Sequence, residues 1–157
     1  MVKRGFMRIW NPESFTWDSF VRCIDYVEKD GKINFLISDG IILTREHLNS
    51  LRDSEVFIQR ILTSYQFIRI LREQQMEKVI IFIISRVSDE WDLLMVESIL
   101  ELLRIKSSIH GSKIILNVIG GPGKLKYYMK PIELAMVGIN PAEAPIWEDQ
   151  QLRQGRL

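Results

Sequence analysis

Two short apolar runs constrain the fold of this 157-residue chain more than any other feature. Residues 79–84 read Val-Ile-Ile-Phe-Ile-Ile, residues 114–119 read Ile-Ile-Leu-Asn-Val-Ile, and a helical pattern covers residues 92–109 between them. A strand that is apolar along its whole length is buried on both faces, and two such strands joined through a helix are parallel. We therefore expect a single α/β domain, whose mixed sheet has a parallel βαβ centre and helices on both faces.

The first third of the chain adds elements on either side of this centre. Residues 5–10 predict a first strand, and Asn11-Pro12 then combines an N-cap with a proline at the first helical position, so a helix should run from Glu13 to Lys29. The apolar residues 33–37 and 41–43 lie on either side of Asp39-Gly40. This pattern predicts a hairpin, although a bulge within one longer strand would look the same.

Two further helices are expected before the central strand. Thr44 is a suitable cap for a short helix through Leu51, and Ser54 for a longer one that reaches about Gln75. In the longer helix an apolar face would point inward. That face comprises Ile58, Ile61, Leu62, Tyr65 and Ile68.

The domain boundary is expected near residue 141. A single domain should cover residues 1–141, with a strand and helix at 5–30 and a core at 32–141. Residues 141–157 contain two prolines and little periodicity, which predicts an extended C-terminal tail at 142–157. Its apolar pair, Ile146-Trp147, has the form of a docking anchor.

Composition and charge limit the classes of partner. The chain is 46% hydrophobic and 26% charged, as in ordinary globular proteins, and 21 basic residues against 20 acidic ones give a net charge of +1. Such a balance provides no field that would attract nucleic acid or an anionic membrane. No apolar run approaches the roughly 20 residues of a membrane helix, and the first residues lack the apolar part of a signal peptide. We expect a cytoplasmic protein that binds neither membrane nor nucleic acid.

A glycine loop follows the second apolar run, in the place where α/β proteins often bind phosphate. It reads Gly120-Gly121-Pro122-Gly123-Lys124, but the P-loop pattern also requires two more loop residues and a hydroxyl after the lysine, where Leu125 stands. A plain turn is the preferred interpretation. The alternative is anion binding through Gly121, Gly123 and Lys124.

An acidic segment, Ser88 to Asp92, follows the central strand. Three carboxylates in four positions could bind a metal, but both histidines, His47 and His110, lie in other predicted segments. We interpret the acids as helix capping and expect no metal site. Ser88, Asp89 and Trp91 are candidates for contact with a partner.

The remaining reactive residues form no catalytic motif. Cys23 is the only cysteine, so the chain has neither an internal disulfide nor a cysteine cluster for zinc, and its position on a helix face predicts core packing. Neither His47 nor His110 stands near a recognisable nucleophile. We expect no catalytic residue and no cofactor.

The order of elements from about Lys32 to Ile146 resembles a STAS domain, the fold of anti-sigma factor antagonists. The family's hairpin, helix, central strand, phosphorylatable loop, helix, strand and terminal helix would correspond to seven segments of this chain. The signature Asp-Ser-[Ser/Thr]-Gly is absent, and Ser88 is the nearest candidate for the phosphorylated position. The segments are 33–43, 54–75, 79–84, 85–91, 92–109, 114–119 and 125–137.

Two other families compete with this resemblance. Residues 114–141 are similar to signal-peptide peptidases of the Clp-type fold, although Leu125-Lys126 stands where their catalytic serine would be. TIR domains also place Ser-x-Trp and an acidic helix after a strand, but Glu97 lies too far from Trp91 to match their catalytic glutamate. Either resemblance would imply a relative without catalytic activity.

A non-enzymatic interaction or assembly module, serving as a regulatory or structural subunit, is the function that these observations favour. Its partner would be another protein or a second copy of the chain, and the tail would dock. The alternative is an enzyme or ligand-binding domain acting on a phosphorylated small molecule or nucleic acid. That site would lie at the carboxyl edge of the sheet, with Ser88, Asp89, Gly121 and Lys124.

Overall fold

The computed structural model describes residues 5–121 and 147–148 of the chain. Strands and helices alternate along most of it, as expected of an α/β domain. In chain order they are β1 (Phe6–Trp10), α1 (Trp17–Val27), β2 (Lys32–Ser38), α2 (Arg45–Asn49), β3 (Glu55–Ile61), α3 (Ser64–Glu73), β4 (Lys78–Ile84), α4 (Ser85–Asp89), α5 (Leu93–Ser108), β5 (Lys113–Ile119) and β6 (Trp147–Glu148).

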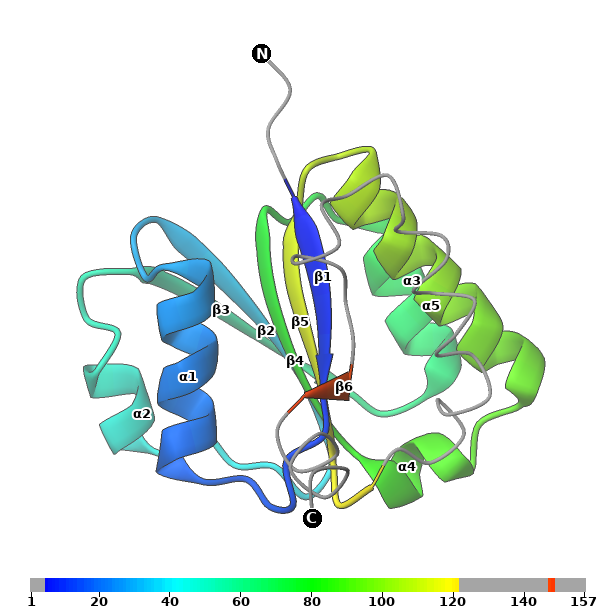
Figure 1. The fold of residues 1–157 in the computed structure, drawn as a ribbon, viewed down its shortest axis with the longest axis horizontal. Coiled ribbons are helices and arrows are strands. Elements are labelled where there is room, and N and C mark those ends of the chain that lie inside the picture. Colours follow the sequence, from blue (N-terminus) through cyan, green and yellow to red (C-terminus); the bar gives the residue numbers. More distant parts are fainter. Residues whose placement is uncertain (1–4, 122–146, 149–157) are drawn as a thin grey trace.

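The strands form one sheet in the order β3-β2-β4-β5-β1-β6, and each described pair is parallel. Helices α1 and α2 cover one face, while α3, α4 and α5 cover the other (Figure 1). The α/β class, the parallel centre and the helices on both faces are therefore confirmed. The expected hairpin is absent, because residues 39–44 form a turn and a loop instead of a second strand.

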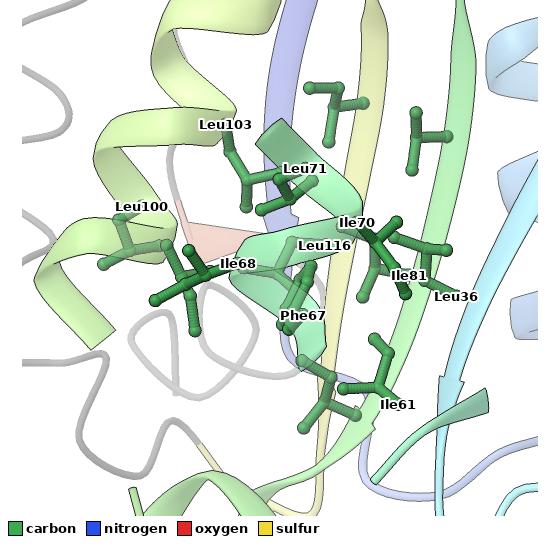
Figure 2. Packing of buried hydrophobic residues seen from close by; sticks show 14 of the residues in the cluster. Leu36, Ile61, Phe67, Ile68, Ile70, Leu71, Ile81, Leu100, Leu103 and Leu116 are labelled. Atoms are coloured by element: carbon green, nitrogen blue, oxygen red, sulfur yellow. The ribbon is translucent and has the colours of Figure 1, made fainter. Parts of the chain in front are cut away.

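Two hydrophobic cores, one on each face, hold the three layers together. In β4, Ile81 points to the core beneath α3 and α5, while Ile80 and Phe82 point to the core beneath α1. Figure 2 shows the first core, in which Phe67 and Leu103 approach the sheet from the two helices. The central strands are buried on both faces, as the apolar runs predict.

Helix α1 begins later than the sequence predicts. Thr16 is its N-cap and forms a capping box with Ser19, whereas Asn11 is buried and its Nδ2 donates to the Val118 carbonyl at 2.6 Å. Asn11 therefore joins β1 to β5 instead of starting a helix. Trp17, the first residue of the helix, is 45% exposed.

The long helix predicted from Ser54 to Gln75 is wrong in its first half. Residues 55–61 form strand β3, and the helix begins only at Ser64, after the N-cap Thr63. Thr63 Oγ1 accepts from the Gln66 amide at 3.0 Å, and Gln66 Oε1 accepts from the Leu62 amide at 2.8 Å. These local bonds fix the helix start, since they satisfy groups that a continuous helix would use internally.

The segment after β4 also differs from expectation. A short helix, α4, occupies Ser85–Asp89, and the N-cap of α5 is Asp92, whose side chain accepts from the Leu94 amide at 2.9 Å. Ser88 is therefore not a helix cap. The STAS resemblance stays a prediction.

None of the helices within residues 5–121 is long and apolar enough to cross a membrane.

A comparison of two glycines tests the packing at the start of β1. A Cβ on Gly5 would lie 2.6 Å from Gly111 C and from Ser112 O and would also overlap Ser107 O, all of them backbone atoms. Gly5→Ala should lower the free energy of unfolding by about 3 kcal/mol, because backbone cannot move aside as a side chain can. Urea unfolding followed by circular dichroism measures this loss.

Gly31→Ala is the matched control for that experiment. Gly31 has a φ of 77°, but a Cβ on this residue would meet no atom within 4 Å, so only backbone strain of about 1 kcal/mol is expected. Equal losses in the two variants would show that the start of β1 is not crowded.

Candidate functional site

The carboxyl edge of the sheet is the first place where a site is expected. The connections after β1 and β2 lead to helices on one face, whereas those after β3 and β4 lead to helices on the other. Strand β2 lies between β3 and β4, so neighbouring connections diverge at its carboxyl end. In open α/β sheets this divergence is where ligands commonly bind.

A tightly held turn, Ser38 to Ile41, occupies that position. Ser38 Oγ accepts from the Ile84 amide at 3.1 Å, which links β2 to the end of β4. Arg60 Nη1 donates to the carbonyls of Ser38 and Ile41, both at 3.0 Å. Gly40 has a φ of 88°, and a Cβ there would overlap the Ile84 side chain. The backbone of this turn therefore fills the crevice. The Arg60 guanidinium is engaged in its two hydrogen bonds to the turn.

The predicted anion loop lies partly at the same edge. Gly121 is close to Ser85, since a Cβ on it would be 3.9 Å from Ser85 Oγ, and the Gly120 amide donates to the Pro12 carbonyl at 3.0 Å. This bond gives Gly120 a structural role in joining β5 to the segment after β1. Gly123 and Lys124 lie outside the described residues, so anion binding by this loop stays a prediction.

The three residues proposed for partner contact after β4 are not presented together. Ser88 is 2% exposed and its Oγ donates to the Ser85 carbonyl at 2.8 Å, while Trp91 is 8% exposed and packs its ring against Phe67. The exposure expected for these two side chains is wrong. Only Asp89 of the three is exposed.

One residue of the predicted docking pair, Trp147, lies at the opposite edge of the sheet from β3. Trp147 belongs to β6, where its backbone is in register with Ile9 of β1 in this same chain. Ile146 lies outside the described residues. The docking role of this pair stays a prediction.

A hydroxyl–imidazole pair is present at Thr44 and His47, with Oγ1 and Nδ1 2.7 Å apart. Nδ1 also accepts from the Thr44 amide at 2.9 Å, which makes the pair a capping box at the start of α2. The imidazole packs among aromatic rings, at 4.7 Å from that of Phe20 and 5.2 Å from that of Trp17. This arrangement explains the pair by helix capping and packing.

Cys23 lies in the core beneath α1, as expected. Its Sγ is 3.3 Å from Asn117 Nδ2, and Asn117 also donates to the Ile81 carbonyl at 3.0 Å. Burial raises the pKa of the Cys23 thiol to about 12, although the bond to Asn117 acts in the opposite direction. The thiol is therefore protonated and shielded. Among residues 5–121 and 147–148, no three His, Cys, Asp or Glu side chains come together as a metal site would need.

Strand β3 carries exposed apolar side chains, a feature that the sequence interpretation missed. Strand β3 is an edge of the sheet, and two neighbouring side chains, Phe57 and Ile58, are 45% and 42% exposed. They point to opposite faces, since Phe57 is paired with Asn34 and Ile58 with Phe35. Leu62 and Tyr65, which follow the strand, are 61% and 74% exposed.

Within the described residues, β2 is the strand that pairs with β3, and the other side of β3 has no strand partner. Lys32 Nζ lies 4.1 Å from the centre of the Phe57 ring, above its face. Gln59 and Gln74 exchange two side-chain bonds of 2.7 and 2.8 Å, which fix the strand to the end of α3. Beside these residues the surface is hollowed by about 460 Å³.

The comparisons with known proteins identify no relative: no family model, no curated protein and no solved structure matches this chain.

The protection of Cys23 can be measured directly. Because its pKa is about 12 and its side chain is fully buried, the native protein should react with a disulfide reagent at pH 8 at least about 100-fold more slowly than the urea-unfolded chain. A colorimetric thiol assay checks this. Equal rates in the native and unfolded states would contradict the packing described for α1.

The pH dependence of stability tests the position of His47. Burial lowers its pKa below the ordinary 6.5, against an opposing effect of Glu46, so the unfolded chain binds the proton more readily than the folded one. This contribution to stability is present above the ordinary pKa and is lost as the pH falls below it. Wild type should lose more stability than His47→Gln between about pH 7.5 and about pH 5.5.

Urea unfolding at the two pH values gives the comparison. His110→Gln, which removes an exposed histidine, is the control for the loss of an imidazole elsewhere in the chain. A His47→Gln variant with the same pH dependence as wild type would contradict the burial of the imidazole.

Proposed function

We propose that this chain is a non-enzymatic assembly module that pairs with a second copy of itself through strand β3. The observation that carries the proposal is a seven-residue edge strand with apolar side chains half exposed on both faces. An edge strand of this kind offers a row of amides and carbonyls as a template for another strand. A strand added there would bury Phe57 and Ile58 together.

The usual protections of an edge strand are weak in β3. Proteins that stay monomeric place prolines, bulges or free charges along such edges. Strand β3 contains no proline and pairs with β2 without interruption from Glu55 to Ile61. The basic residue on the strand, Arg60, is bound through its guanidinium to the Ser38–Ile41 turn, so its charge is not free to protect the edge. Strand β3 therefore has little steric or electrostatic protection against pairing with a second copy.

The sequence of β3 favours an antiparallel second copy. Its acidic residue, Glu55, stands at the start and its basic residue, Arg60, near the end. A two-fold axis at Phe57 would place Glu55 of each strand across from Gln59 of the other, so that the two Glu55 side chains stay apart. Parallel pairing would bring like charges together.

The side chains also match in the antiparallel arrangement. If Phe57 lies across from Phe57 of the second copy, then Val56 lies across from Ile58 on the other face of the sheet. Aromatic and β-branched cross-strand pairs stabilise sheets by about 0.2–1 kcal/mol each. Two-fold self-association is also the commonest form of oligomer.

Sedimentation velocity over a range of protein concentrations tests this assembly. Wild type should form a dimer whose fraction rises with concentration. Phe57→Lys should weaken the dimer at least about tenfold, because two like charges would face each other across the axis. Circular dichroism should show the same fold in both proteins.

Leu94→Lys is the matched control. Leu94 is 71% exposed on α5, far along the chain from β3, and its replacement should leave the dimer unchanged. A wild-type protein that remains monomeric at every concentration would rule out self-pairing. Equal weakening by the two lysines would show that β3 is not the interface.

A further inference from the structure

A hollow of about 360 Å³ lies at the amino edge of the sheet, opposite the edge considered above. It forms where α3 and α5 end and where β4 and β5 begin, near the top of Figure 1. Its volume is in the range of small-molecule sites, roughly 300–1,000 Å³. The fold class alone would not indicate it, since open α/β sheets usually bind ligands at the carboxyl edge.

A buried cation, Lys106, lines this hollow from the last turn of α5. The residue is 8% exposed, and its Nζ donates to the Gln74 carbonyl at 2.7 Å. An ammonium has two further N–H groups, and within residues 5–121 they have no other acceptor. No carboxylate of the described chain forms an ion pair with it.

The position is energetically costly for a charge without a counter-ion. Burial lowers the pKa of the Lys106 ammonium, which reflects the loss of hydration around it. The Gln74 carbonyl at the end of α3 offsets part of this cost through its partial negative charge. A bound anion would offset more, because a full opposite charge in a place of low dielectric interacts strongly.

Other donors surround the same hollow. Arg72 and His110 line it, and neither side chain makes a hydrogen bond or ion pair with the rest of the described chain. Glu77 contributes one opposing negative charge. The cationic groups therefore exceed the acidic ones at this place.

The rest of the wall is apolar. Leu71 and Met76 are buried beside the hollow, and Leu102 and Ile105 line it from α5. A ligand that fits both parts of the wall has an anionic group and a small apolar body.

We propose that this hollow binds a small organic oxyanion, a carboxylate or a phosphate monoester, held by Lys106 and Arg72. Charge-assisted hydrogen bonds from the ammonium and the guanidinium would fix the anionic group. The apolar body would lie against Leu71 and Ile105. The site contains no residue of β3, so its occupation does not depend on the assembly proposed above.

NMR titration of the full chain at constant ionic strength tests the proposal. The probes are phenyl phosphate and benzoate, with sodium chloride as the reference salt. Saturable shifts of amide signals are expected within residues 71–77 and 102–112 for at least one of the two probes. The probe that binds more tightly identifies the oxyanion as phosphate or carboxylate.

Three variants locate the binding. Lys106→Met should weaken the tighter probe at least about tenfold, as the loss of a charged hydrogen bond predicts. Arg72→Gln, at an exposed position, should weaken it by a smaller factor and keeps the test decisive if Lys106→Met does not fold. Lys29→Met removes an exposed lysine elsewhere and should leave the affinity unchanged.

The proposal would be overturned if neither probe gave saturable shifts in this region. It would also be overturned if Arg72→Gln and Lys106→Met bound as tightly as wild type. In that case Lys106 serves only to hold the end of α3.

Discussion

The burial of β4 on both faces is the constraint on which the rest of the structure depends. Residues 79–83 are at most 2% exposed, and no strand with apolar side chains on both sides is stable unless two helical layers cover it. One layer comes from the helices that follow β1 and β2, and the other from those that follow β3 and β4. The chain therefore passes from one face to the other through β3, which follows β2.

This passage explains why the carboxyl edge is filled and β3 is open. The chain turns sharply after β2, and Ser38, Arg60 and Ile84 hold the turn by direct bonds. The crevice that often holds a ligand in such sheets is occupied here by the turn itself. Strand β3 then pairs with β2 on one side only, and its other side faces outward. The exposed edge of β3 and the filled crevice thus both result from the path of the chain after β2.

The two proposals use different surfaces for a physical reason. At β3 the exposed groups are backbone amides, carbonyls and apolar side chains, which suit another strand. At the amino edge the exposed groups surround a buried ammonium, Lys106, which suits an anion.

The elements with the strongest apolar signal could be predicted from the sequence. Strands β4 and β5 and helix α5 lie where the apolar runs and the helical pattern place them, because burial on both faces leaves little alternative. Strand β3 could not be found in the same way. Its residues Ile58, Ile61 and Leu62 also have helical spacing, and only half of an edge strand is buried.

A local signal could have corrected the error at β3. Thr63 and Gln66 have the spacing of a capping box, which places the helix start at Ser64 and leaves the preceding β-branched residues to a strand. The candidate sites could not be predicted in this way, because they depend on contacts between residues far apart in the sequence. The approach of Gln74 to Lys106 joins two helices, and no pattern within either helix indicates it. Ser88 and Trp91 were misjudged because α4 turns them toward the core.

The strand order has a consequence for how the chain folds. Strand β1 does not lie beside β2; it lies between β5 and β6, and Phe6 is in register with Lys113, far along the chain. During synthesis the first strand therefore stays without its partner until almost the whole domain has left the ribosome. Folds with such distant pairings form slowly, and the early chain exposes apolar strands while it waits. Strand β1 should thus be among the last parts of the described domain to become protected.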